Sequence, residues 1–96
     1  MTLRFSVRAR SHLNAIQEYI SERNPGAAAR VGERIRESAD MLQFFPYAGR
    51  VGRSANTREW VVQGYPYILV YEVDASQPPN VTVLGVFHQA QDPGRR

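Results

Sequence analysis

The clearest hydrophobic pattern in the chain runs from Thr57 to Val73 and predicts a strand, a tight turn and a second strand. From Tyr67 onward, β-branched and aromatic residues alternate at a period of two, and both faces stay apolar until Glu72. Gly64 interrupts the run before it, and such a break between two period-two segments is typical of a β-hairpin. A strand that is apolar on both faces is expected near the centre of its sheet. The sequence therefore predicts a central hairpin that other elements must cover.

Two segments with helical spacing precede this hairpin. Apolar residues recur at three- and four-residue steps over Ala9–Ser21 and again over Ala27–Phe45. Ser11 is a candidate N-cap for the first helix. Asn24, followed by Pro25 at the first helical position, marks the start of the second. Because the break between them is short, we expect an antiparallel helical hairpin.

Two further segments alternate as strands do, Thr2–Val7 and Val81–His88. Gly85 inside the second predicts a β-bulge or a close backbone approach. Turn-forming residues predict loops over Pro46–Asn56 and Asp74–Asn80. The remaining tail, residues 89–96, has no periodicity and is expected to be mobile towards its end.

The predicted order is strand, helix, helix and then three strands. Three sequential strands most simply form an antiparallel meander, with the helical hairpin covering one of its faces. We therefore expect one α+β domain over residues 1–96, in which an N-terminal strand and an antiparallel helix hairpin pack on an antiparallel β-meander in two layers. The first strand should join the sheet at an edge, but either edge is compatible with the sequence.

Composition narrows the classes of function. A chain of 96 residues buries only about 60–65% of its unfolded surface, which favours a shallow site or a partner-binding surface over a deep cavity. The lack of cysteine excludes disulfides and thiolate metal sites. No apolar stretch approaches the ~18 residues of a membrane span, and the first residues lack the apolar region of a signal peptide. We expect a soluble, cytoplasmic protein that does not enter the membrane.

Charge points to an acidic partner or to nucleic acid. The net charge is +3, and all 12 basic residues are arginine, which binds carboxylates and phosphates through a planar fork and almost never acts as a base. A charge of +3 is equally ordinary for a soluble domain. The strongest local basic patch is Arg50, Arg53 and Arg58, since no acidic residue precedes them after Asp40. The alternative is that they pair in space with one of three carboxylates, Glu18, Glu22 and Glu59.

Other charges and aromatic residues divide between surface and core. The outer face of the second helix alternates in sign and is expected to be solvated, with three pairs across one turn, Arg30–Glu33, Glu33–Arg36 and Arg36–Asp40. Among the aromatic residues of the hairpin, Trp60 and Tyr71 are expected in the core. Tyr65 and Tyr67, at the turn, are expected on the surface. Exposed aromatic residues beside arginines are typical of protein interfaces.

A set of positions spread in order over most of the chain carries a family resemblance. They are Ala9, Leu13, Ile16, Tyr19, Ile20, Leu42, Pro46, Gly49, Arg50, Arg58, Tyr67, Ile68, Tyr71 and the run Val86-Phe87-His88. Together they resemble the toxins of the RelE/ParE superfamily of bacterial toxin–antitoxin modules, and most of all the ParE branch, often labelled plasmid-stabilisation proteins. Two positions depart from that pattern. Gln91 stands where an arginine is common, and His12 where an acidic residue is common.

The resemblance implies a toxin that is neutralised by a cognate antitoxin in a heteromeric complex. ParE-like members act on DNA gyrase, and RelE-like members cleave mRNA on the ribosome. We therefore expect a gyrase poison. Two alternatives are a ribosome-dependent endoribonuclease and a chain that has lost its toxicity and remains a binding module. Target or antitoxin contacts are expected at six residues: Arg50, Arg53, Arg58, Tyr65, Tyr67 and His88.

The nuclease alternative would draw on His88, Arg58, Glu59 and Tyr71. His88 titrates near neutrality and suits a general acid or base. Neighbouring residues on a strand point to opposite faces, however, so only one of Arg58 and Glu59 can readily share a site with His88. The alternative role for His88 is structural, as a histidine at a strand end that holds the tail by a hydrogen bond.

No metal or cofactor is expected. His12, His88 and the scattered carboxylates have no metal-ligand spacing. The sequence contains neither a nucleophile elbow nor a glycine-rich phosphate loop. A conventional hydrolase is therefore disfavoured.

Overall fold

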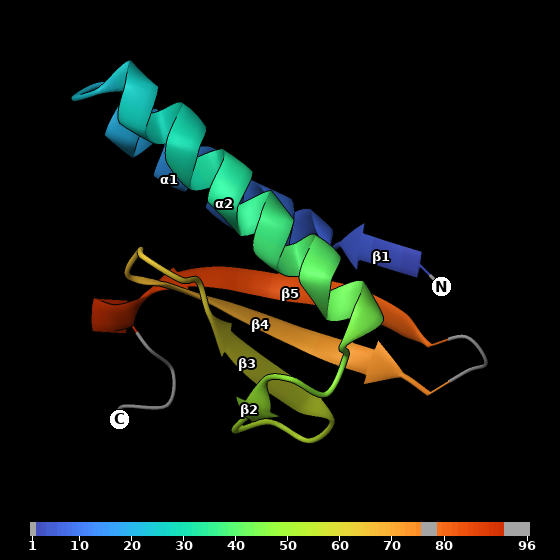
Figure 1. Cartoon of the computed structure of the whole chain (residues 1–96). Coiled ribbons are helices and arrows are strands. Elements are labelled where there is room, and N and C mark those ends of the chain that lie inside the picture. The colour runs from blue at the N-terminus through green and yellow to red at the C-terminus, as the bar shows by residue number, and fades with distance from the viewer. Residues whose placement is uncertain (1, 76–78, 92–96) are drawn as a thin grey trace.

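The computed structural model describes residues 2–75 and 79–91, and within them an α+β fold in which two helices pack on a sheet (Figure 1). The elements are β1 (Thr2–Phe5), α1 (Val7–Ser21), α2 (Pro25–Phe44), β2 (Arg50–Val51), β3 (Thr57–Val61), β4 (Tyr67–Asp74), β5 (Asn80–His88) and a 3₁₀ turn, η1 (Gln89–Gln91). No helix of the described residues is long and apolar enough to cross a membrane. The expected mobility at the end of the tail concerns residues 92–96, which lie outside the described part.

The sheet has the strand order β1-β5-β4-β3-β2. The last three long strands form the predicted antiparallel meander, and β4, the strand that is apolar on both faces, lies at its centre as expected. The first strand joins the β5 edge in parallel, with Leu3 opposite Val81. Both helices cover the same face of the sheet, which confirms the two-layer α+β prediction (Figure 1).

The first helix starts earlier than its periodicity suggested. Ser6, not Ser11, is the N-cap, and its hydroxyl accepts a hydrogen bond from the Ala9 N–H at 3.0 Å. The predicted strand over Thr2–Val7 is therefore wrong at its end, since Val7 is already helical. A tertiary contact explains where β1 ends. The Ser6 N–H donates to the Val83 carbonyl at 2.9 Å, and this hydrogen bond places the end of β1 just before Ser6. The predicted second cap is confirmed, as the Asn24 side chain accepts from the Ala27 N–H at 3.1 Å.

The loop predicted over Pro46–Asn56 contains a short edge strand. In β2, Arg50 pairs with Glu59 and Val51 with Arg58. A two-residue strand has no measurable period, so the sequence pattern could not reveal it. The predicted bulge at Gly85 is confirmed by a register shift, in which consecutive residues of β4 face Gly85 and Val83 and so skip one residue of β5.

The core lies between the helices and the sheet and includes the fully buried Tyr71, as predicted. Trp60 is partly buried and packs against this core. Tyr67 corrects the prediction, because only 9% of it is exposed. It is the first residue of β4 and faces the helices, where its ring meets the His88 ring edge-on with centroids 5.5 Å apart. Tyr65 is half-buried and also packs against the core.

Candidate functional site

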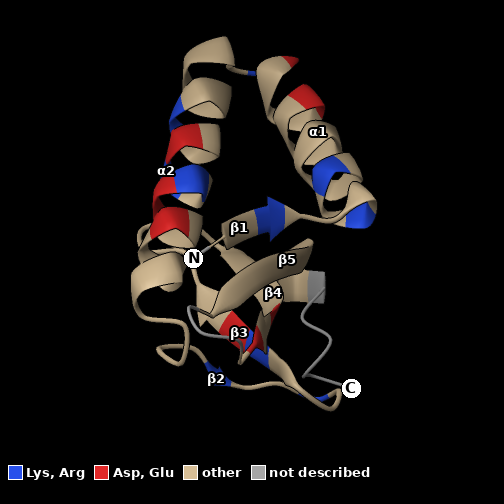
Figure 2. Ribbon diagram, turned by 90° about the vertical axis from the view of Figure 1, so that its right-hand side faces the viewer, with Lys and Arg blue, Asp and Glu red and all other residues tan. Residues whose placement is uncertain are grey.

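A groove opens between the two helices where β1 passes them. The helices diverge from their connecting turn, and β1 crosses between their open ends (Figure 2). The space measures about 920 Å³. We call it the helix groove, and its lining residues are Leu3, Arg4, Phe5, Ser6, Val7, Arg10, Leu13, Asn14, Arg36, Asp40 and Thr82.

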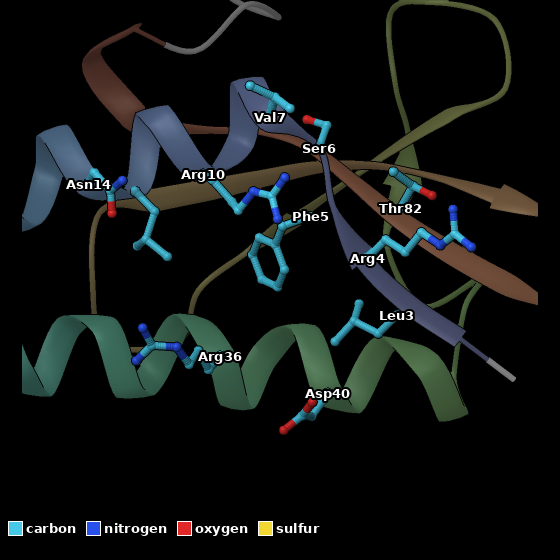
Figure 3. A pocket seen from close by; sticks show the side chains of 11 residues that line it. Leu3, Arg4, Phe5, Ser6, Val7, Arg10, Asn14, Arg36, Asp40 and Thr82 are labelled. Atoms are coloured by element: carbon cyan, nitrogen blue, oxygen red, sulfur yellow. The ribbon is translucent and has the colours of Figure 1, made fainter.

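The helix groove combines an apolar floor with cations on three elements. Leu3 and Phe5 point from β1 towards α2 (Figure 3). Arg10 from α1 and Arg36 from α2 line the same space, and Arg4 borders it on β1 with a side chain that points away from Leu3 and Phe5 (Figure 3). The outer edge of β1 has no strand beside it within the described residues, since β1 pairs only with β5. An open sheet edge offers backbone N–H and C=O groups to an extended peptide.

The three arginines of the helix groove have no ion-pair partner in the part of the chain that the structure describes. All three are exposed, and within residues 2–75 and 79–91 none of them forms an ion pair. The pairs expected for Arg36 on α2 do not form, and the ion pair on that face is Arg34–Glu37, at 3.2 Å. Asp40 is the only carboxylate that lines the groove among the described residues. The groove therefore presents excess positive charge around an apolar floor.

A second constellation lies at the other edge of the sheet, around the Tyr71 hydroxyl. This group donates to the Pro46 carbonyl at 2.8 Å and accepts from the Gly49 N–H at 2.9 Å. Burial raises the pKa of the Tyr71 phenol, while the Gly49 hydrogen bond and the Arg58 charge act in the opposite direction. Only glycine fits at position 49, because a Cβ there would lie 2.6 Å from both the Glu59 carbonyl oxygen and the Tyr71 hydroxyl. The phenol is therefore a buried anchor for the segment after α2.

Arg58 holds the same segment from its other side. Its Nη1 donates to the Gly49 carbonyl at 2.8 Å and to the Tyr47 carbonyl at 3.3 Å. Its guanidinium carbon lies 5.0 Å from the centre of the Tyr47 ring, within the range of a cation–π contact. Arg58 is thus engaged in holding the chain's own backbone.

Arg50 is also engaged within the chain. Its Nε and Nη2 donate to Glu59 Oε1 at 2.9 and 2.7 Å. The Glu59 side chain is 5% exposed and that of Arg50 is 57% exposed, so the cation covers a buried carboxylate. Such a carboxylate needs a partner, since desolvation disfavours its charge. The alternative of pairing with Glu59 is therefore confirmed for Arg50, and Arg53 remains as an exposed arginine of the predicted patch.

The residues of the nuclease alternative are not brought together. His88 pairs with Tyr67 at the start of β4, whereas Arg58 pairs with Tyr71, four residues further along that strand, a separation of about 13 Å. Glu59 lies on the opposite face from Arg58, as predicted, and is neutralised by Arg50. Tyr71 is buried and has both of its hydrogen-bond partners inside the chain.

Both histidines are held by backbone amides. His88 Nδ1 accepts from the Ala90 N–H at 3.0 Å, which confirms the predicted tail-holding role. His12 Nδ1 accepts from the Val86 N–H at 3.1 Å, and burial followed by the nearby Arg8 charge lowers the pKa of His12. In each neutral ring the other nitrogen then carries the proton, so no lone pair is left for a metal or for proton abstraction. Among the described residues, no group of three metal-ligating side chains occurs.

Sequence reasoning missed the helix groove. The alternation over Thr2–Val7 places Arg4 on the face opposite Leu3 and Phe5, and Arg36 lies on the face of the second helix expected to be solvated, so neither element taken alone indicates a shared site. A signal was nevertheless present, because the predicted hairpin brings the start of the first helix and the end of the second together near the first strand. Arg4, Arg10 and Arg36 all lie at that end of the molecule.

Comparison with known proteins gives one family. Residues 3–93 match the family described as the ParE toxin of type II toxin–antitoxin system, parDE. The chain is 39% identical to the candidate toxin Y4kP of Sinorhizobium fredii over 89 residues, which cover 93% of this chain and 88% of that protein. It is 41% identical to toxin RelE2 of Caulobacter vibrioides over 66 residues, 69% of this chain and 73% of that protein.

Two solved structures share the fold. The chromosomal ParDE toxin–antitoxin system from P. aeruginosa contains a chain that superposes with a TM-score of 0.80 at 21% identity, covering 92% of this chain and 95% of that one. The YoeB/ParE toxin from Agrobacterium tumefaciens gives a TM-score of 0.63 at 18% identity, covering 92% and 98%. At these identities the likeness establishes the shared α+β architecture.

Proposed function

The chain belongs to the ParE toxin family of type II toxin–antitoxin systems, within the RelE/ParE superfamily, and on that premise we propose that it poisons DNA gyrase and is neutralised by an acidic antitoxin segment bound in the helix groove. The proposal that an antitoxin binds in the helix groove rests on one observation. Three arginines without ion pairs among the described residues surround an apolar floor. It also agrees with the family description, which names a toxin–antitoxin pair.

The chemistry of the helix groove defines the segment that fits it. Apolar side chains would cover Leu3 and Phe5, and carboxylates would meet the guanidinium groups of Arg10 and Arg36 at the rim. A segment of this composition is disordered when free and folds on binding, and it can add to the open edge of β1 by main-chain hydrogen bonds. Opposite charges make such an association fast and sensitive to salt.

The proposal that gyrase is the target rests on the family and on the chemistry of the described residues. Cleavage of RNA through the 2′-hydroxyl needs a base and an acid near one phosphate. Here the sequence has no lysine, and the hydrogen bonds of the two histidines occupy the lone pair that a base would use. Binding to a protein target requires none of these groups. The contact roles of Arg50, Arg53, Arg58, Tyr65, Tyr67 and His88 stay predictions.

One observation favours a second candidate. The similarity to toxin RelE2 keeps ribosome-dependent mRNA cleavage as the alternative. A toxin that retains only antitoxin binding is the third reading, because Gln91 replaces a cation common in the ParE branch.

The test compares the two targets directly. We expect purified toxin to inhibit supercoiling by gyrase and to leave ribosome-bound mRNA intact. The His88→Gln variant, whose amide oxygen can still accept the Ala90 N–H, should arrest growth as the wild type does. Loss of a general acid or base would instead reduce the rate by about 10²–10⁴-fold. Codon-specific mRNA fragments that disappear in His88→Gln would replace the gyrase proposal with the nuclease.

A further inference from the structure

The end of α2 and the strand beside it expose large apolar side chains. Phe44, Phe45 and Tyr47 are 63%, 64% and 56% exposed, and Val51 on β2 is 77% exposed. Val51 pairs with Arg58, and Arg58 contacts the Tyr47 ring, so the four belong to one region. We call Phe44, Phe45, Tyr47 and Val51 the aromatic edge. β2 and β1 are the two outer strands of the sheet, so the aromatic edge and the helix groove lie at opposite ends of the strand order.

The backbone beneath the aromatic edge is fixed by several hydrogen bonds. The Phe45 N–H bonds the Met41 carbonyl at 3.0 Å, and the Ala48 N–H bonds the Phe45 carbonyl at 3.1 Å. Tyr71 and Arg58 then hold Gly49 from two sides. The exposed rings therefore belong to a segment that buried groups hold in place, which is how proteins preorganise a binding surface.

The protein surface beside the aromatic edge is positively charged. The Glu59 carboxylate lies buried beneath Arg50, so the guanidinium faces solvent. Exposed aromatic rings bordered by arginines are the composition of protein-binding hot spots.

We infer that the aromatic edge is the surface through which the chain contacts the protein that it poisons, at an acidic surface with apolar pockets for Phe44 and Phe45. This rests on the proposed function, in which the target is a protein and the antitoxin occupies the helix groove.

The experiment uses the Phe44→Ser, Phe45→Ser double variant of the full chain, with Tyr19→Ser as a matched control that removes a ring of similar exposure from α1. Hot-spot rings each contribute at least about tenfold to binding, so the double variant should need at least about tenfold more protein to inhibit gyrase and should fail to arrest growth. Its affinity for the antitoxin and its melting temperature should stay at the wild-type values. Tyr19→Ser should match the wild type in every assay.

Each other outcome has a defined meaning. Growth arrest at wild-type level in the double variant, or loss of antitoxin binding together with toxicity, would overturn the inference. Suppose that the wild type leaves purified gyrase unaffected, that the wild type and Tyr19→Ser arrest growth, and that the double variant does not. The gyrase proposal then fails, and the assignment of the aromatic edge as a target surface stands. A photo-crosslinker at position 45 should label a protein of the gyrase complex, and labelling of RNA or DNA instead would overturn the protein assignment. A wild-type chain that neither arrests growth nor inhibits gyrase would overturn both proposals.

Discussion

The arginines at the two edges of the sheet do different work. At the β2 edge, Arg50 covers the buried Glu59 and Arg58 bonds the carbonyls of Tyr47 and Gly49. At the β1 edge, the arginines of the helix groove form no ion pair within the described residues. The first set contributes to the stability of the fold, whereas a partner can pair with the second without breaking an ion pair among the described residues. Local charge density along the sequence therefore does not reveal which cations are already paired, since the densest patch contains Arg50.

From this comparison we expect that substitutions at the β2 edge lower the free energy of unfolding. The largest effect is expected for Tyr71→Phe, which leaves the Gly49 N–H and the Pro46 carbonyl without their partner inside the protein. Each unsatisfied buried group costs about 1–3 kcal/mol, so the free energy of unfolding should fall by about 2–4 kcal/mol. Chemical denaturation measures this, with Tyr65→Phe as the control. A loss equal to that of the control would mean that the segment after α2 is held by other contacts.

The second effect concerns Arg50→Ala, which leaves Glu59 buried without this charged partner. Because Arg50 itself is more than half exposed, water moderates the penalty, and we expect a loss of about 1–2 kcal/mol in the free energy of unfolding. The double variant Arg50→Ala, Glu59→Gln should recover part of it, because the uncompensated charge is then gone. Strictly additive losses in the double-mutant cycle would argue against the pair.

The smallest effect is a pH dependence at the edge of β5. The folded state lowers the pKa of His12 below its ordinary 6.5, so the unfolded chain binds the proton more readily. The contribution of His12 to stability is complete above pH 6.5 and declines as the pH falls below that value. Protonation also removes the acceptor of the Val86 N–H. In His12→Gln, this part of the pH profile should flatten, and an unchanged profile would assign it to other groups.

The sequence predicted the order and packing of the elements better than it predicted where each element begins and ends. Period-two and helical spacing gave the hairpin, the helices and the central place of β4, because those patterns reflect which face is buried. The choice of Ser6 over Ser11 as N-cap depends on the hydrogen bond from the Ser6 N–H to Val83, a residue far along the chain. The burial of Tyr67 likewise depends on the helices above it, which the pattern around the turn does not show.

The site was less predictable for the same reason. A pairing partner for Arg50 could be named, because Glu59 was one of three candidates, but its burial could not. The helix groove needs three elements to meet, and no one of them carries an unusual pattern. The aromatic edge was visible only as Phe44 and Phe45 at a helix end, where sequence alone does not distinguish buried rings from exposed ones.

The most direct test of the proposed groove measures the affinity of a cognate antitoxin for two variants of equal charge. Arg10→Ala, Arg36→Ala removes two arginines of the helix groove, and Arg23→Ala, Arg30→Ala removes two exposed arginines outside it. We expect the groove variant to bind about 10–100-fold more weakly and with a smaller dependence on salt, while the control stays within about threefold of the wild type. Equal weakening in both variants, or none in the groove variant, would contradict it.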